Sequence, residues 1–246
     1  MPNQKGYFML RSTSQLLGHR LTALDGEIGH VKDFYFDDKE WAVRYVIVKT
    51  GSWLSDRQVL ISPRSVGRID DAGKVILVNL TRKQVEGSPV IDTQKPISRQ
   101  YEELYHQHYG YPYYWAGNGL WGMTDIPMWS PFPVLVPAVT DLDSGKTANN
   151  AESHLRSINE VKGYHLQAQD GTIGQLCDFM IDEKTWAISR LTIETGHWYA
   201  GKKVFLLPKH IDRFSYEDAT ISVNLTLDDI SGTAKNEVAH LGSVNE

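Results

Sequence analysis

Cysteine is almost missing from the sequence, and long apolar runs are missing altogether. The one cysteine, Cys177, has no partner for a disulfide within the chain, and an unpaired thiol fits a reducing compartment. The first eleven residues lack the apolar stretch of a signal peptide, and the run 132–139 is short and contains two prolines. We therefore expect a cytoplasmic protein without a membrane-spanning segment.

An excess of positive charge is missing as well. The chain has 25 lysines and arginines against 30 aspartates and glutamates, a formal net charge of −5. This balance gives no general attraction to phosphate backbones or anionic lipid, so we expect neither a nucleic-acid partner nor membrane insertion. The sequence also has no nucleophile elbow and no glycine-rich phosphate loop. We predict no catalytic residue, no cofactor and no enzymatic activity.

What the sequence does contain is an internal repeat. Residues 16–89 align without a gap onto residues 161–234, and roughly one position in three is identical. The shared residues cluster at turns: Asp25-Gly26 recurs as Asp170-Gly171. An Asp-Gly pair between extended segments favours a hairpin, because glycine tolerates positive φ. Roughly five or six short strands in each copy, separated by regular turns, predict a mainly β fold, either a sandwich or a barrel.

The two copies predict which positions are buried. Positions that are apolar at period two in both copies form the expected interior, for example Val46 and Val48 with Leu191 and Ile193. The alternate positions are apolar only in the first copy, where Tyr45, Ile47, Val75 and Leu77 align with Arg190, Thr192, Thr220 and Ser222. We expect this outer face of the first copy to be covered by the second repeat, by the linker or by another subunit.

Residues 90–150 form a linker that has no counterpart after the second repeat. Ser98 is a helix cap, and we predict a short helix over Arg99 to Tyr109 that ends at Gly110. Its apolar face is expected to hold the side chains of Tyr101, Leu104, Tyr105 and His108.

Aromatic residues follow this helix and alternate with glycine and proline. They include Tyr113, Tyr114, Trp115 and Trp121. Two interpretations are open: the aromatics pack across both repeats as a clamp, or they form a platform for a partner or ligand. Residues 141–151, rich in small polar residues, are typical of a flexible linker.

Several charged groups resemble chemical sites. Asp25, Asp33 and Asp37 recur in the second copy and could form an acid/base or metal set. Aspartates at turns and strand ends more often cap backbone amides, and we take these as structural. His106 and His108 point away from each other on a helix and match no zinc spacing, so we predict no metal site.

The loops 52–58 and 197–203 each carry a tryptophan, which either anchors a partner or closes the end of its domain. His197, beside Trp198, replaces Ser52 of the first copy and is the histidine that we would test for a role peculiar to the second copy. The full set of interaction candidates is Tyr45, Ile47, Trp53, Val75, Leu77, Tyr113, Tyr114, Trp115, Trp121, His197 and Trp198.

The opening Asp-Gly-x-Ile-Gly-x-x-x-Asp-Phe of residues 25–34, the Asp37 turn before Trp41 and the strand 59–63 together resemble the PRC-barrel family. That family includes the photosynthetic reaction centre H subunit and the C-terminal domain of the ribosome maturation factor RimM. The resemblance covers both repeats and implies two small six-stranded barrels that act in protein interaction or assembly. We predict a first domain at 8–89, an aromatic-rich linker with a short helix at 90–152 and a second domain at 153–235.

The function expected first is a non-catalytic, bacterial interaction or assembly module, in a stress or membrane-complex context. Its partner is a protein, either a different one or a second copy of this chain. One alternative is a small-molecule binder or enzyme with a pocket between the repeats, lined by Tyr113, Tyr114, Trp115 and His108. Another alternative is a ribosome-associated or RNA-associated factor, against which the acidic balance weighs.

Overall fold

The computed structural model describes residues 9–91, 96–128, 154–196 and 201–232. The chain divides into two compact units, each with its own β-sheet. Unit 1 comprises Met1–Met9, Leu16–Ser157 and Glu183–Ala187, and unit 2 comprises Leu10–Gln15, Ile158–Asp182 and Ile188–Glu246. Among the described residues, no helix has the length and apolar content needed to cross a membrane.

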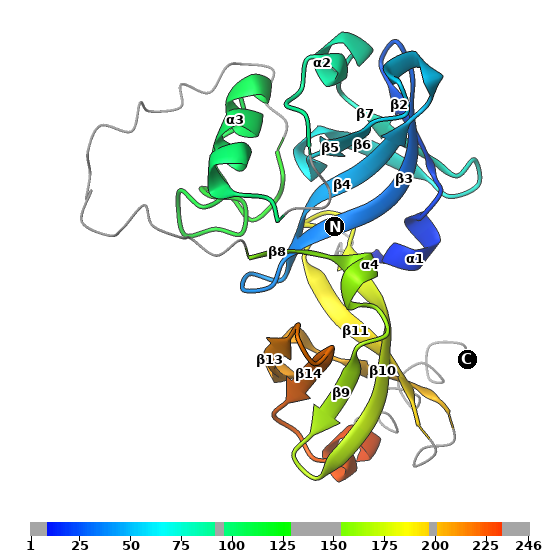
Figure 1. Ribbon diagram of the computed structural model, residues 1–246, viewed down its shortest axis with the longest axis vertical. Coiled ribbons are helices and arrows are strands. Elements are labelled where there is room, and N and C mark those ends of the chain that lie inside the picture. Colours follow the sequence, from blue (N-terminus) through cyan, green and yellow to red (C-terminus); the bar gives the residue numbers. More distant parts are fainter. Residues whose placement is uncertain (1–8, 92–95, 129–153, 197–200, 233–246) are drawn as a thin grey trace, which may run out of the picture. The chain divides into compact units, whose positions relative to one another are not determined.

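The sheet of unit 1 is antiparallel except for one parallel pair. Its strands are β2 (Arg20–Ala23), β3 (Gly26–Asp37), β4 (Ala42–Thr50), β5 (Gln58–Ile61), β6 (Val66–Asp70), β7 (Val75–Val78) and β8 (Leu155–Ser157). The order is β5-β4-β3-β2-β7-β6, with β2 and β7 parallel and β8 paired to β3 (Figure 1). Within the described residues no pairing joins β5 to β6, so the strand path is open where a closed barrel was expected.

The sheet of unit 2 has the same strand order. Its strands are β9 (His165–Ala168), β10 (Gly171–Asp182), β11 (Ile188–Thr195), β12 (Lys203–Leu206), β13 (Ile211–Ser215) and β14 (Thr220–Val223), joined by β1 (Leu10–Ser12). The order is β12-β11-β10-β9-β14-β13, with β9 and β14 parallel. The mainly β fold predicted from the turn spacing is confirmed.

β1 and β8 are the same tripeptide, Leu-Arg-Ser, and each pairs with the long strand of the other repeat. Ser12 in β1 donates a hydrogen bond to Asp178 in β10, and Ser157 in β8 donates one to Asp33 in β3 at 2.5 Å. The predicted domain ranges place β1 in the first domain (8–89) and β8 in the second (153–235), whereas β1 pairs with the sheet of the second repeat and β8 with that of the first. Sequence position could not show this exchange, because a short strand pairs wherever a sheet edge is free.

A glycine shared by both copies lets the two long paired strands of each sheet, β3 with β4 and β10 with β11, approach closely. Gly29 and Gly174 have φ of +156° and +158°. A Cβ atom added there would lie 2.1 Å from the Lys49 carbonyl oxygen or 2.0 Å from that of Glu194. The Ile-Gly pair of the shared motif is therefore a requirement of this close approach.

The helices are short. They are α1 (Thr13–Leu16), α2 (Arg82–Glu86), α3 (Arg99–Tyr109) and α4 (Ile158–Val161), with 3-10 turns η1 (Ser52–Leu54), η2 (Pro63–Ser65) and η4 (Pro208–His210). The predicted limits of α3 are confirmed: Ser98 caps its first turn by accepting from the Tyr101 N–H, and Gly110 ends it with φ of 67°.

The predicted buried face of α3 is confirmed for Tyr105 and Tyr101, which pack against the buried cluster, and is wrong for Leu104 and His108. The side chains of Glu102, Tyr105 and His106 are buried, whereas Leu104 is 52% exposed and His108 is exposed. The helix is rotated because the sheet beneath it supplies hydrogen-bond partners for Glu102 and His106, which the apolar periodicity of α3 does not encode.

Candidate functional site

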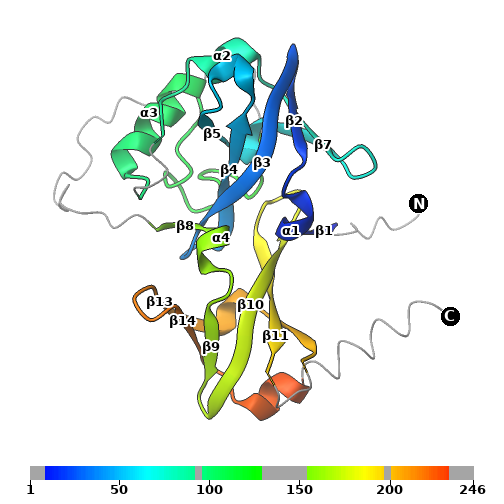
Figure 2. The same cartoon turned by 45° about the vertical axis from the view of Figure 1, so that its right-hand side comes forward.

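A segment of the linker covers the outer face of the unit 1 sheet. This cover, defined as residues 97–128 with α3 at its start, lies over β3, β4 and β5 (Figures 1 and 2). A buried apolar cluster joins the two layers, formed by Tyr35, Tyr45, Ile47 and Leu60 of the sheet with Ile97, Tyr105 and Tyr111 of the cover and Leu155 of β8. The expectation that Tyr45 and Ile47 are covered, with the linker as one of three named occupants, is confirmed.

Tyr105 fixes the cover to the sheet. Its ring meets the ring of Tyr45 edge-on, with centroids 5.1 Å apart. Its hydroxyl accepts from the Ser62 N–H at 2.8 Å and donates to the Leu60 carbonyl at 3.3 Å. Burial raises the pKa of Tyr105 well above its usual value. The hydroxyl therefore stays protonated and acts as a structural hydrogen-bonding group.

A buried carboxyl group lies beside this aromatic contact. Glu102 accepts from the Tyr45 hydroxyl at 3.0 Å and from the Tyr114 hydroxyl at 2.7 Å. Arg99 forms an ion pair with it at 2.9 Å. Burial raises the pKa of Glu102, an effect that the Arg99 charge and the two hydroxyl donors oppose. The partners thus compensate the cost of burying the carboxylate.

His106 is buried and neutral. Its Nδ1 lies 3.0 Å from the Pro112 carbonyl oxygen, which can only accept, so Nδ1 carries the proton. Its Nε2 lies 3.2 Å from the Tyr45 hydroxyl. Burial, and then the nearby charge of Arg64, lowers the pKa of His106 to about 3. The Tyr45 hydroxyl has a single proton, for which Glu102 and His106 Nε2 compete as acceptors.

Arginines and aromatic rings alternate between the sheet and the cover. Arg99 lies 3.9 Å from the Trp115 ring centroid and 5.5 Å from that of Tyr114. Arg44 lies 4.0 Å from the Tyr114 centroid and 5.1 Å from that of Trp121. Cation–π contacts are worth about 2 kcal/mol when shielded from water, as for the buried Arg44, and about 0.5–1 kcal/mol when exposed, as for the partly exposed Arg99. The stack therefore contributes to holding the cover in place.

Two buried arginines of the first repeat also bind backbone carbonyls of the cover. Arg44 donates to the Leu120 carbonyl, and Arg64 donates to the carbonyls of Trp121 at 2.6 Å and Met128 at 3.3 Å. Burial lowers the pKa of Arg64 to about 10, which still leaves it charged at neutral pH. The cover is therefore fastened by charged donors as well as by apolar contact.

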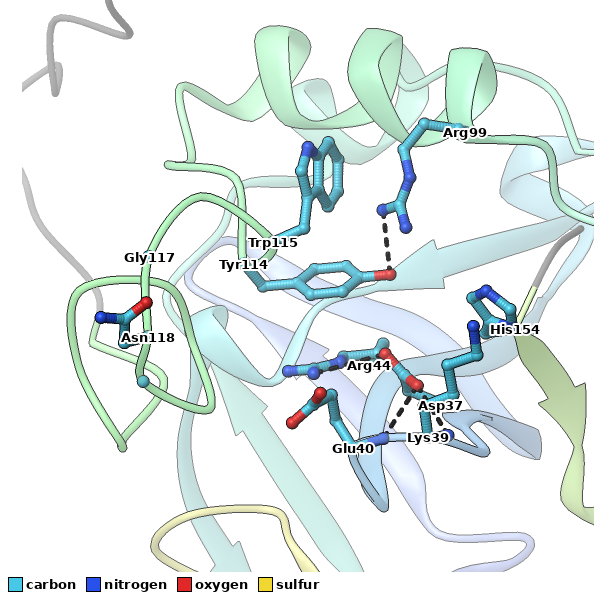
Figure 3. A pocket seen from close by; sticks show the side chains of 11 residues that line it. Asp37, Lys39, Glu40, Arg44, Arg99, Tyr114, Trp115, Gly117, Asn118 and His154 are labelled. Carbon is cyan, nitrogen blue, oxygen red and sulfur yellow. Dashed lines mark hydrogen bonds and ion pairs between the residues drawn. The ribbon is translucent and has the colours of Figure 1, made fainter. Parts of the chain in front are cut away.

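A cavity of about 390 Å³ lies under one end of the cover (Figure 3). Tyr114 and Trp115 of the predicted pocket line it, but His108 does not: its Nε2 lies 2.8 Å from the Gln84 carbonyl oxygen. Tyr113 stacks on Trp115 with centroids 4.6 Å apart. The full lining is Asp37, Lys39, Glu40, Arg44, Arg99, Tyr114, Trp115, Gly117, Asn118, Gly119 and His154.

The equivalent face of unit 2 is more open among the described residues. Met180, Arg190 and Phe205, which align with Tyr35, Tyr45 and Leu60, are half-buried, and Leu207 is 40% exposed. Arg190 lies 5.9 Å from the Phe205 ring centroid. Thr192 is buried, and its hydroxyl has no hydrogen-bond partner among the described residues. We call the surface of Met180, Arg190, Thr192, Phe205 and Leu207 the open face.

The remaining interaction candidates differ in exposure. Trp53 donates to the Ile28 carbonyl at 2.7 Å and lies under Arg82 at 4.2 Å, as expected for a tryptophan that closes one end of its domain. Val75 is half-buried and Leu77 is 37% exposed, so the expectation that the whole outer face of the first copy is covered is wrong at Leu77. Tyr114 and Trp121 are buried, Tyr113 and Trp115 are half-buried, and His197 and Trp198 lie outside the described residues.

The repeated aspartates cap backbone amides, as predicted. Asp25 accepts from the Arg82 N–H at 2.7 Å, and Asp170 accepts from the Leu227 N–H at 2.9 Å. Asp37 accepts from the N–H groups of Lys39 and Glu40. In the described part of the chain, no three His, Cys, Asp or Glu side chains gather as a metal site would require.

Sequence reasoning missed the charged residues that hold the cover, which are Arg44, Arg64, Arg99 and Glu102. One signal was available, because Arg44 aligns with Ser189 in the second copy. A large charged residue that only one copy carries marks a position whose role differs between the copies.

Residues 14–94 match the PRC-barrel domain family. The first repeat is therefore similar to PRC-barrel domains. A curated relative from Deinococcus radiodurans, described as an uncharacterized protein, is 31% identical over 121 residues. The aligned part spans 43% of this chain and 43% of that relative. The cover begins at Ile97, just beyond the matched PRC-barrel domain, so it is an addition to the part that the family defines.

Proposed function

We propose that the protein is a non-catalytic interaction module built from two PRC-barrel domains, in which the open face of unit 2 binds an amphipathic, acidic helix of a partner protein. The observation that carries this proposal is the contrast between the two units. The same sheet face holds an amphipathic helix in unit 1 and is half-exposed in unit 2. The setting that we propose is the bacterial cytoplasm.

The geometry of unit 1 suggests how such a helix would bind. α3 presents Tyr105 to the apolar part of the sheet and Glu102 to Tyr45. At the aligned positions unit 2 offers Phe205 and Arg190 (for Leu60 and Tyr45), which supply an apolar surface and a cation. A helix with an acidic residue where α3 has Glu102 would therefore place a carboxylate beside Arg190 and its apolar side against Phe205.

The charges of the open face are mixed. Arg190 is positive, while Lys203 on β12 lies opposite the exposed Glu194 on β11. Arg190 is therefore the charge that favours an acidic residue in a bound helix. Complementary charge mainly sets which partner binds and how fast it associates, while the apolar residues Phe205 and Leu207 supply contact area.

The test uses the full chain and a fluorescent peptide with the sequence of residues 97–111, which contains α3 with two glutamates and one arginine. We expect anisotropy to report binding, and Arg190→Glu to weaken it at least roughly tenfold. A peptide with Glu102→Lys should recover affinity for the Arg190→Glu protein. The matched control is Arg213→Glu, an exposed arginine on β13 that should leave binding unchanged.

Two outcomes would overturn the proposal. One is a peptide affinity that Arg190→Glu and Arg213→Glu change equally, because the attraction would then be non-specific. The other is a dimer in sedimentation experiments that Phe205→Ser abolishes, since the occupant of the open face would then be a second copy of this chain.

A further inference from the structure

The cavity of unit 1 has a lining dominated by cationic hydrogen-bond donors. Lys39, Arg44 and Arg99 contribute their charged groups, and His154 lies at the same wall (Figure 3). Arg44 is only 1% exposed, and its Nε has no hydrogen-bond partner among the described residues. An acceptor that reached this donor would remove the cost of leaving it unpaired.

The acidic groups of the lining do not offer an equivalent site for a cation. Asp37 is engaged, since its Oδ1 accepts the N–H groups of Lys39 and Glu40 and its Oδ2 faces Arg44 at 3.5 Å. Glu40 is exposed, next to Lys39 on the same turn. Lys39, Arg44 and Arg99 outnumber Asp37 and Glu40 in the lining, while Arg44 also pairs with Asp37 and Arg99 with Glu102. The remaining excess of positive charge is small and favours an anion.

The aromatic residues of the lining are also engaged. Arg44 and Arg99 both lie against the Tyr114 ring, and Trp115 packs against Arg99 and against Tyr113. A ligand would therefore be recognised by N–H groups rather than by stacking on a ring. The Asn118 amide and the backbone of Gly117 add neutral polar groups at the opposite wall (Figure 3), and Gly119 also lines the cavity.

We propose that this cavity binds a small oxyanion, a carboxylate or phosphate group, between Lys39, Arg44 and Arg99. The three cations supply donors that match carboxylate and phosphate oxygens, and arginine does so with a planar pair of N–H groups. Because Arg44 and Arg99 also fasten the cover, a bound anion stabilises the covered state of unit 1. The site is separate from the open face of unit 2.

The experiment measures binding of inorganic phosphate and of succinate to the full chain by calorimetry at constant ionic strength. The two variants are neighbours on one exposed turn, so neither should disturb the fold. We expect Lys39→Gln to weaken binding about fivefold and Glu40→Gln to strengthen it about twofold, because one removes an attractive and the other a repulsive charge. The matched control is Lys49→Gln, an exposed lysine of β4 outside the cavity, which should change nothing.

The two probes distinguish the source of the oxyanion, since preference for phosphate indicates a phosphorylated ligand and preference for succinate a carboxylic acid. Three results would overturn the proposal. The first is that neither probe binds up to about 10 mM. The second is that Lys39→Gln and Lys49→Gln lower the affinity equally. The third is that Glu40→Gln weakens binding instead of strengthening it.

Discussion

The covered face of unit 1 and the open face of unit 2 belong to the same strand order, yet they differ in chemistry. In unit 1, Tyr45 and Leu60 are almost fully buried beneath the cover. In unit 2, their counterparts Arg190 and Phe205 are half-exposed. The difference teaches that duplication kept the residues that shape turns and interior, while one outer face acquired a partner within its own chain.

The strongest way to break this contrast is to remove an anchor of the cover. Trp121 is buried, and its indole N–H donates to the Thr185 carbonyl at 2.7 Å. Trp121→Ala should lower the stability of the covered face by about 4 kcal/mol, the usual cost of truncating a buried tryptophan. Hydrogen exchange of β4 amides would measure this.

The matched control for Trp121→Ala is Phe205→Ala on the open face, where we expect about 1 kcal/mol because the ring is already half-exposed. Equal losses for the two variants would mean that the faces do not differ in packing.

Acid should open unit 1 before unit 2. His106 is neutral when folded, with its pKa lowered to about 3, whereas unfolding restores a pKa near 6.5. Its contribution to stability is thus complete above about pH 6.5 and is lost as the pH falls towards 3, which amounts to about 3 kcal/mol between pH 6.5 and 4. Urea unfolding across this range would measure it.

His106→Gln should flatten that pH profile, while His165→Gln, an exposed histidine of unit 2, should not. A profile of the same steepness in wild type and His106→Gln would show that other groups account for the acid sensitivity.

Substitutions on the buried and the exposed side of α3 should differ in their cost to stability. Tyr105→Phe leaves the Ser62 N–H without its acceptor and should cost about 1.5 kcal/mol. Leu104→Ala, on the exposed side of the same helix, should cost less than about 0.5 kcal/mol. Thermal unfolding of both variants would test the orientation of the helix, and the reverse ranking would contradict it.

The smallest effects concern the exchanged tripeptides. Ser12→Ala and Ser157→Ala each remove one hydrogen bond to an aspartate and should each cost about 1 kcal/mol. Hydrogen exchange should report the first loss at β10 of unit 2 and the second at β3 of unit 1. Losses at the opposite strands would contradict the observed pairing.

The sequence predicted those features that depend on neighbouring residues. The Asp-Gly turns, the capping aspartates, the strand alternation and both ends of α3 follow from backbone conformation and hydrogen bonds within a few residues. The difference between the copies at Tyr45 and Ile47 also predicted that a face of the first copy is covered, because the burial of a sheet face shows in its alternate residues.

The tertiary structure decided which groups meet. The buried side of α3, the pairing of β1 with β10 and of β8 with β3, and the stack of Arg44 and Arg99 with aromatic rings all join residues distant in sequence. Apolar periodicity does not encode these contacts, since a buried glutamate or arginine is tolerated only where other elements supply its partners. Local sequence therefore determined the helices and strands of this protein. Contacts between buried charged groups and partners distant in sequence determined the position of the cover on the sheet.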